Sequence, residues 1–183
     1  MQQLELISER LRLRLIHEED VKAIHELHSM PETDQFNTLG IPQSIEETAK
    51  IVQEWVKQNK AHDIRQYTFV IELKTDSTFI GLLGFSTDPI KYKRAEVWFK
   101  TIVSQWGKGY TTEALSRIIN FGFSELQLHR IQAGCAVGNI ASIKVLEKVG
   151  MTREGRGRQV LPLKSGWSDN YEYAILETDP RSF

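Results

Sequence analysis

The sequence predicts a single mixed αβ domain whose sheet is mostly antiparallel with one parallel pair of strands. The 183 residues match one ordinary domain, with 40% hydrophobic and 26% charged residues. Strand-like and helix-like segments follow in the order β α α β β β α β α β β. A strand–helix–strand unit over residues 94–137 requires a parallel pair, whereas short turns elsewhere favour antiparallel neighbours. We therefore expect one domain, 1–183, with about seven strands.

The first half of the chain is predicted to hold one strand, two helices and a β-hairpin. The first strand alternates arginine and leucine, so one face is apolar and the other basic. Ser44 and Glu47 match a capping box, in which a serine hydroxyl and a carboxylate satisfy free backbone N–H groups. The expected elements are a strand at 10–15, a helix opened by 17–20, a long connection at 31–42, a helix from 45 to about 59, and hairpin strands at 67–73 and 79–85.

The second half is predicted to hold the parallel pair and a closing hairpin. Asn139 is expected to cap a helix, and Gly150 to end it in the C′ position. The expected elements are strands at 94–103 and 131–137, helices at 112–123 and 140–149, and hairpin strands at 152–161 and 169–177.

Composition excludes several classes of protein. A formal charge of −1 excludes a generally basic nucleic-acid binder, so no direct nucleic-acid partner is expected. Cys135 is the only cysteine, so we expect no internal disulfide. No H-x-x-x-H pair occurs, so we expect no metal site, and His25 and His28 are expected at a helix surface and edge. No apolar run approaches the roughly 20 residues that span a bilayer, and no signal segment opens the chain. The expectation is a cytoplasmic protein without a membrane partner.

The segment 103–114, VSQWGKGYTTEA, carries two glycines where a strand ends and a helix begins. Glycines allow positive φ and bring backbone N–H groups close to a ligand, and the helix start adds the positive end of its dipole. A plain tight turn is the alternative. The spacing excludes a Walker A loop, because Ile102 and Gly109 stand where glycine and Ser or Thr are required, and Thr112 excludes a dinucleotide fingerprint.

Together with the segment 135–151, CAVGNIASIKVLEKVGM, this loop resembles the GNAT acetyltransferase superfamily, most closely its branch of ribosomal-protein N-terminal (alanine/serine) acetyltransferases. The early R-L-R-L-R strand also fits, and the resemblance covers nearly the whole chain. It implies a GNAT-like domain with a strongly twisted sheet, helices on both faces and central parallel strands that splay to admit the cofactor. It also implies an acyltransferase that moves an acetyl group from acetyl-CoA to a primary amine, by direct attack in a ternary complex.

The resemblance further implies which residues bind acetyl-CoA. Backbone amides of the loop would cradle the pyrophosphate, Ile102 and Val103 would pair with pantetheine, and Asn139 and Ser142 would face the pantetheine arm and the sulfur. The implied set is Ile102, Val103, Trp106, Gly107, Lys108, Gly109, Tyr110, Thr111, Asn139 and Ser142. Two positions depart from the family: Thr111 replaces Gly or Ala, and Leu146 replaces a tyrosine that protonates the departing thiolate in many relatives.

Two residues are candidates for catalysis. Glu96, flanked by apolar residues, is expected to act as the base, directly or through water; alternatively it is an exposed carboxylate paired with Lys93 or Arg94. Ser142 is expected to assist departure of the thiolate, with helix capping as its alternative role. Backbone N–H groups near 97–99 would stabilise the oxyanion. Cys135 is read as a small apolar filler rather than as a nucleophile.

The acceptor amine is less defined by the sequence. The leading hypothesis is a protein N-terminal α-amine, for instance of a ribosomal protein, and it rests on the resemblance. An α-amine has a reference pKa of about 7.7–8.0, against about 10.4 for lysine, so it needs only modest assistance from a base. A polyamine or antibiotic acceptor and a non-catalytic acyl-CoA-binding sensor are the alternatives, and a homodimer or higher homo-oligomer stays open.

Overall fold

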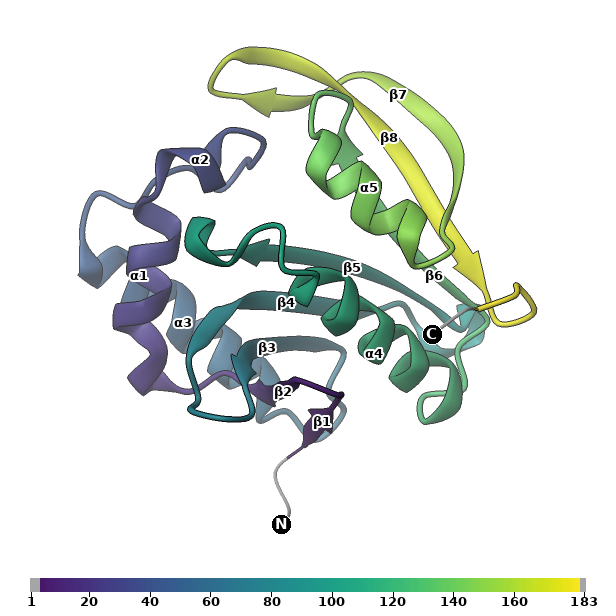
Figure 1. Cartoon of the computed structure of the whole chain (residues 1–183), viewed down its shortest axis with the longest axis horizontal. Helices are drawn as coiled ribbons and strands as arrows, with labels where there is room; N and C mark the ends of the chain where they lie inside the picture. The colour runs from purple at the N-terminus through teal and green to yellow at the C-terminus, as the bar shows by residue number, and fades with distance from the viewer. Residues whose placement is uncertain (1–3, 182–183) are drawn as a thin grey trace.

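The computed structural model describes residues 4–181, which form one eight-stranded sheet with helices on both faces (Figure 1). The strands are β1 (Glu5–Ile7), β2 (Leu11–Leu15), β3 (Gln66–Leu73), β4 (Phe79–Thr87), β5 (Arg94–Thr101), β6 (Arg130–Ala136), β7 (Thr152–Leu163) and β8 (Gly166–Leu176). The α-helices are α1 (Val21–Ser29), α2 (Pro31–Asp34), α3 (Ile45–Asn59), α4 (Tyr110–Ser124) and α5 (Ile140–Lys148). The predicted fold class is confirmed.

The strands lie in the order β1-β2-β3-β4-β5-β6-β8-β7. Every neighbouring pair is antiparallel except β5 and β6, so the predicted parallel pair is confirmed. The eighth strand is β1, which pairs with β2 and was not expected because three residues are too short to show an alternating pattern.

The basic face of β2 is neutralised within the sheet. Arg12 and Arg14 both pair with Glu72 on β3, and Arg14 also donates to Asp20 with Nη2–Oδ1 at 2.7 Å. Glu72 is only 3% exposed, and buried carboxylates of this kind require paired charges. These arginines therefore hold the first two long strands together and are not available as a surface for phosphate groups.

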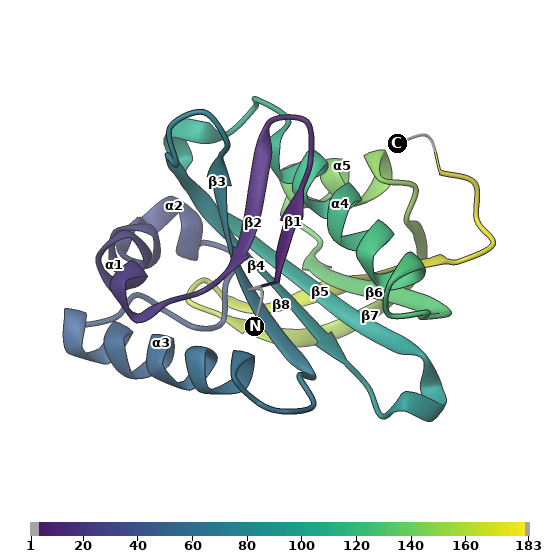
Figure 2. The same ribbon diagram turned by 90° about the horizontal axis from the view of Figure 1, so that it is seen from below.

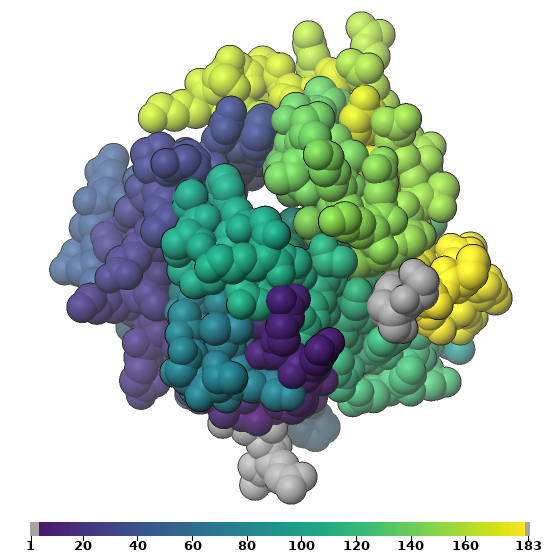
Figure 3. Space-filling model, viewed as in Figure 1, coloured from purple at the N-terminus to yellow at the C-terminus, as the bar shows by residue number. Residues whose placement is uncertain are grey.

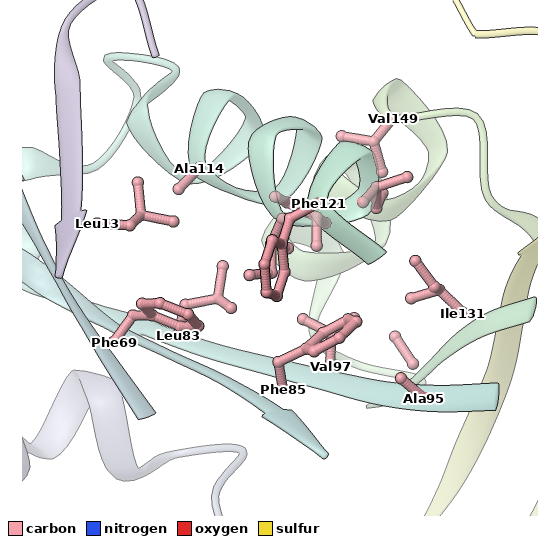
Figure 4. Close-up of a cluster of buried hydrophobic side chains, with 14 of the residues drawn as sticks. Leu13, Phe69, Leu83, Phe85, Ala95, Val97, Ala114, Phe121, Ile131 and Val149 are labelled. Carbon is pink, nitrogen blue, oxygen red and sulfur yellow. The ribbon is translucent and has the colours of Figure 1, made fainter. Parts of the chain in front are cut away.

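The helices pack in two layers, with α4 and α5 on one face of the sheet and α1, α2 and α3 on the other (Figure 2). The larger core lies under α4, where Phe121 projects toward Phe69 and Phe85 with ring centroids 6.5 and 6.3 Å apart (Figure 4). The smaller core joins α1 and α3 to the opposite face through Val70 and Leu82. His28, expected at a helix surface, is instead buried at this side, only 1% exposed.

The segment between α1 and α3 is more ordered than a plain connection. It contains the short helix α2, whose first position is Pro31, a favoured place for proline because no N–H is needed there. The hydroxyl of Thr33 donates to the carbonyl of Leu27 at 2.6 Å and so folds α2 back on α1. Ser44 caps α3 as predicted, but the carboxylate of Glu47 accepts from Gln43 N–H rather than completing the capping box.

None of the helices within residues 4–181 is both long enough and apolar enough to cross a membrane. Within the same residues, no three His, Cys, Asp or Glu side chains come together in a way that would hold a metal ion.

Candidate active site

The parallel strands β5 and β6 separate soon after they meet. They are paired only from Arg94 and Arg130 to Glu96 and Gln132, although β5 continues to Thr101 and β6 to Ala136. Beyond these three pairs, β5 stays paired with β4 and β6 with β8. The backbone groups of β5 and β6 that point toward each other therefore face an opening and have no hydrogen-bond partners in the sheet. The expected splay is therefore present, and two cavities lie along it.

The first, which we call the cofactor cavity, has a volume of about 340 Å³. It is bordered by the end of β5, the loop that follows, the first turn of α4 and one side of α5 along its whole length. Seven of the residues implied by the family resemblance line it: Trp106, Gly107, Gly109, Tyr110, Thr111, Asn139 and Ser142.

The geometry of the loop suits an anion. Gly107 and Gly109 have φ of +75° and +81°, a left-handed conformation that favours glycine, and Gly109 is the N-cap of α4. The indole Nε1 of Trp106 donates to the carbonyl of Thr101 at 2.9 Å and anchors the loop to β5. Because α4 begins at Tyr110, two residues earlier than expected, its free N–H groups and the positive end of its dipole lie at this cavity.

The turn between β1 and β2 braces this helix start. Glu113, in the first turn of α4, accepts at 2.7 Å from the Ser8 hydroxyl, from the Arg10 backbone N–H and from the Arg10 Nε. Arg10 also donates to the carbonyl of Lys108 at 3.1 Å and stacks over the Tyr110 ring at 4.6 Å. Burial opposes ionisation of Glu113, but the bonds from Arg10 and Ser8 outweigh it and lower its pKa. Sequence reasoning missed this brace, because its partners lie about a hundred residues apart.

Two of the implied pantetheine-pairing residues lie away from the cofactor cavity. The N–H of Ile102 donates to the carbonyl of Ile80 at 2.9 Å, and its side chain packs against the smaller core. Val103 begins a short 3₁₀ turn, because β5 ends at Thr101, two residues before the expected limit. The part of β5 that borders the cavity is therefore Phe99 to Thr101.

The lysines at this site also differ from the expectation. Lys108 donates to the side chain of Gln105 at 2.9 Å and does not line the cavity. Lys144 and Lys148, one turn apart on α5, do line it, together with Lys100. Their i, i+4 spacing on the predicted helix was the available signal. Three cations and one helix N-terminus against a single carboxylate, Glu32, make the cofactor cavity suitable for phosphate groups.

The second cavity, the acceptor cavity, has a volume of about 330 Å³ and lies beside the first. Residues 33–38, the diverging parts of β5 and β6, and α5 form most of its wall. In the space-filling view this face is hollowed between α2, the segment after β5, and α5, which all line the neighbouring cofactor cavity (Figure 3). Five residues line both cavities: Thr33, Phe99, Lys100, Asn139 and Ser142. They mark the junction at which a thioester in one cavity would meet an amine in the other.

The residues on α5 match their predicted roles in part. The Oδ1 of Asn139 accepts from the Ser142 backbone N–H at 3.1 Å, so the predicted cap is confirmed. Ser142 lines both cavities, and its hydroxyl has no hydrogen-bond partner among the described residues. Leu146 is 1% exposed and lines the acceptor cavity, so this position offers no proton.

Lys100 and Cys135 are the two ionisable side chains that line the acceptor cavity, and no carboxylate does. Burial raises the pKa of the Cys135 thiol to about 11, followed by the influence of Glu147, so the thiol is neutral at physiological pH. A neutral, nearly buried thiol is a poor nucleophile, which favours the filler role.

Glu96 lies outside the residues that line either cavity. Its side chain is exposed, and the apolar surroundings expected from its sequence neighbours are absent, because strand neighbours alternate between the two faces of the sheet. The alternative pairing with Arg94 is also not formed, since Arg94 pairs with Asp88. The structure therefore leaves Glu96 a route to the junction only through water.

The chain is similar to known proteins in both sequence and fold. A family model described as an acetyltransferase (GNAT) domain matches residues 10–152. The uncharacterised N-acetyltransferase YnaD of Bacillus subtilis is 32% identical over 179 residues, covering 95% of this chain and 98% of its own. The crystal structure of a GNAT-family acetyltransferase from Bacillus anthracis is 29% identical, with a TM-score of 0.83 over 95% of this chain and 99% of that one.

Two other similar proteins have names that specify different acceptors. A ribosomal-protein-serine acetyltransferase of Escherichia coli is 28% identical over 173 residues, covering 93% of this chain and 94% of its own. A spermidine N-acetyltransferase of Vibrio cholerae, solved with CoA and spermine, shares the fold at 22% identity, with a TM-score of 0.81 over 92% and 96% of the two chains. The chain belongs to the GNAT acetyltransferase family and is an acetyl-CoA-dependent N-acetyltransferase.

Proposed function

We propose that the acceptor is the α-amine of a protein N-terminus, such as that of a ribosomal protein. The observation that carries this proposal is the wall of the acceptor cavity, which has no carboxylate and one buried ammonium, that of Lys100. A polyamine carries several positive charges and needs anionic partners, whereas an α-amine that enters uncharged needs none. The similarity to the ribosomal-protein-serine acetyltransferase along nearly the whole chain supports the same class.

The reaction we propose is direct transfer. The acetyl thioester lies at the junction of the two cavities, and the uncharged amine attacks its carbonyl from the acceptor cavity. The backbone N–H groups of Val97 and Phe99, which point away from β4 toward the opening between β5 and β6, stabilise the oxyanion. Ser142 donates a hydrogen bond to the sulfur, and Glu96 accepts the amine proton through water. No covalent step on Cys135 is needed, in line with its neutral, nearly buried thiol.

Release of free CoA thiol tests the acceptor class. The protein is given acetyl-CoA with each of four acceptors: a peptide with a free N-terminal serine or alanine, the same peptide with an acetylated N-terminus and an internal lysine, spermidine, and an aminoglycoside. The proposal expects rapid release only with the free α-amine. Faster release with spermidine or the aminoglycoside would refute it, and acetyl-CoA binding without release in any mixture would favour a non-catalytic sensor.

A further inference from the structure

Three buried polar atoms lack a hydrogen-bond partner in the described residues, and they lie together. They are Nδ1 of His28 on α1, Oδ1 of Asp34 on α2 and Nζ of Lys100 on β5. Lys100 interacts electrostatically with both of the others. Because buried polar groups in folded proteins nearly always have partners, three such atoms in one place point to a ligand that completes them.

The position of Lys100 at both cavities indicates that this ligand is a substrate. Its side chain belongs to a residue only 7% exposed, and it lines both cavities. Among the five residues at the junction it is the only one with an ionisable proton. The hydroxyl of Ser142 can donate a hydrogen bond to a thiolate, but giving up its proton would leave an alkoxide, whereas an ammonium becomes a neutral amine.

We propose that the ammonium of Lys100 donates the proton to the departing CoA thiolate, the role that Leu146 cannot fill. This rests on the proposed position of acetyl-CoA. When the amine nitrogen has bonded to the carbonyl carbon, the C–S bond breaks and its electron pair goes to sulfur, which takes a proton from Nζ. Lys100 is then a neutral amine and regains a proton from water, while the proton of the acceptor nitrogen leaves by the Glu96 route.

The titration of Lys100 is matched to this role. Burial lowers its pKa to about 8, against a smaller opposing effect of Asp34. A thiol such as that of CoA has a reference pKa of about 8.5, so transfer between the two is nearly balanced. Burial and Lys100 lower the pKa of His28 to about 4, so that ring is neutral in the assay range. The titratable groups around Lys100 are His28, Glu32, Asp34, Cys135, Lys144 and Lys148.

The first test needs no acceptor. The ultraviolet absorbance of the thiolate reports ionisation of CoA bound to the protein, in the wild type, in Lys100→Met and in Lys144→Met. We expect the bound thiol of the wild type to ionise at a pH lower by about one unit than in Lys100→Met, a tenfold change. Lys144→Met, which removes an exposed cation from the cofactor cavity, should follow the wild type. Equal ionisation in the wild type and Lys100→Met would overturn the proposal.

The second test is kinetic and uses whichever acceptor releases thiol. We expect kcat of Lys100→Met to fall by about 10²-fold or more, with the melting temperature recorded alongside to show that the variant is folded. Lys100→Arg keeps the cation but does not give up its proton near neutrality, so it should recover only part of the activity. Lys144→Met should raise KM for acetyl-CoA rather than lower kcat.

The pH profile of the wild type tests the role of Lys100 without depending on whether a variant folds. Lys100 acts while protonated, so kcat at saturating acceptor should fall as pH rises through about 8, and this limb should be missing in Lys100→Arg. A kcat that rises through pH 8 would make Lys100 a base and overturn the proposal, as would a loss below threefold in Lys100→Met. If every acceptor fails, the proposed function fails, and the thiolate titration still decides the role of Lys100.

Discussion

Glu113→Ala is expected to loosen the brace that holds the start of α4 against the turn between β1 and β2. The carboxylate accepts three hydrogen bonds at 2.7 Å, one from Ser8 and two from Arg10. The alanine variant loses all three, together with a favourable negative charge in the first turn of the helix. The loop of Gly107 and Gly109 is expected to loosen as well, because Arg10 also donates a hydrogen bond to the carbonyl of Lys108.

The size of the effect follows from the exposure of the partners. A hydrogen bond to a charged group contributes about 1.5–3 kcal/mol and the helix dipole about 0.3–1 kcal/mol. The Arg10 side chain is 44% exposed and Glu113 16%, so the freed donors of Arg10 regain water and the losses do not add. We therefore expect the variant to lose about 2–3 kcal/mol, which lowers the melting temperature by about 4–12 °C in a domain of this size.

Thermal unfolding and the KM for acetyl-CoA measure the two consequences. The matched control is Glu125→Ala, which removes an ion pair with Arg117 at the other end of the same helix. Glu125 is 51% exposed, and such a surface pair contributes about 0–1 kcal/mol. We expect KM for acetyl-CoA to rise in Glu113→Ala and to stay unchanged in the control.

The pH dependence gives the sign of the electrostatic part. Because the folded-state pKa of Glu113 is lowered, its contribution is complete above the unfolded pKa of about 4.3 and is lost as pH falls through the folded value. The difference in stability between the wild type and Glu113→Ala should therefore shrink below about pH 4. A melting temperature within 1 °C of the wild type at pH 7, or a KM equal to that of Glu125→Ala, would refute the reasoning.

Three further predictions concern the cofactor loop, the base and the cysteine. Gly109→Val should raise the KM for acetyl-CoA about tenfold or more, since a non-glycine residue in the left-handed region costs about 1–2 kcal/mol. The control is Gly40→Val, which has the same φ of +81° but lies outside the linings of both cavities, and it should leave the KM for acetyl-CoA unchanged. Glu96→Gln should lower kcat about 10²–10⁴-fold near neutral pH, and the ratio to the wild type should narrow as pH rises; a loss below about threefold with an unchanged profile would make Glu96 an ordinary strand carboxylate. Cys135→Ala should retain activity, and an acetylated Cys135 trapped with ping-pong kinetics would contradict direct transfer.

The amino-acid sequence by itself determined the order of the elements other than β1 and α2, the parallel pair and the ends of several helices. The Asn139 cap, the stop at Gly150 and the glycine turn before α4 depend on contacts within a few residues of the chain. Such local contacts are visible in a single sequence, as is the alternation along each long strand. The family resemblance added the cofactor loop, and seven of its ten implied residues line the cofactor cavity.

Only the tertiary structure decided which side chains meet at the junction. Lys100, His28 and Asp34 come from three elements and are brought together by the packing of α1 and α2 over β5, so neither spacing nor periodicity relates them. Arg10 and Glu113 are likewise 103 positions apart in the chain. The exposure of Glu96 depends on which face of β5 is covered, which is a property of the assembled layers. Long-range contacts of this kind form only when the strands and helices have assembled into the complete domain, and the chemistry of the site depends on them.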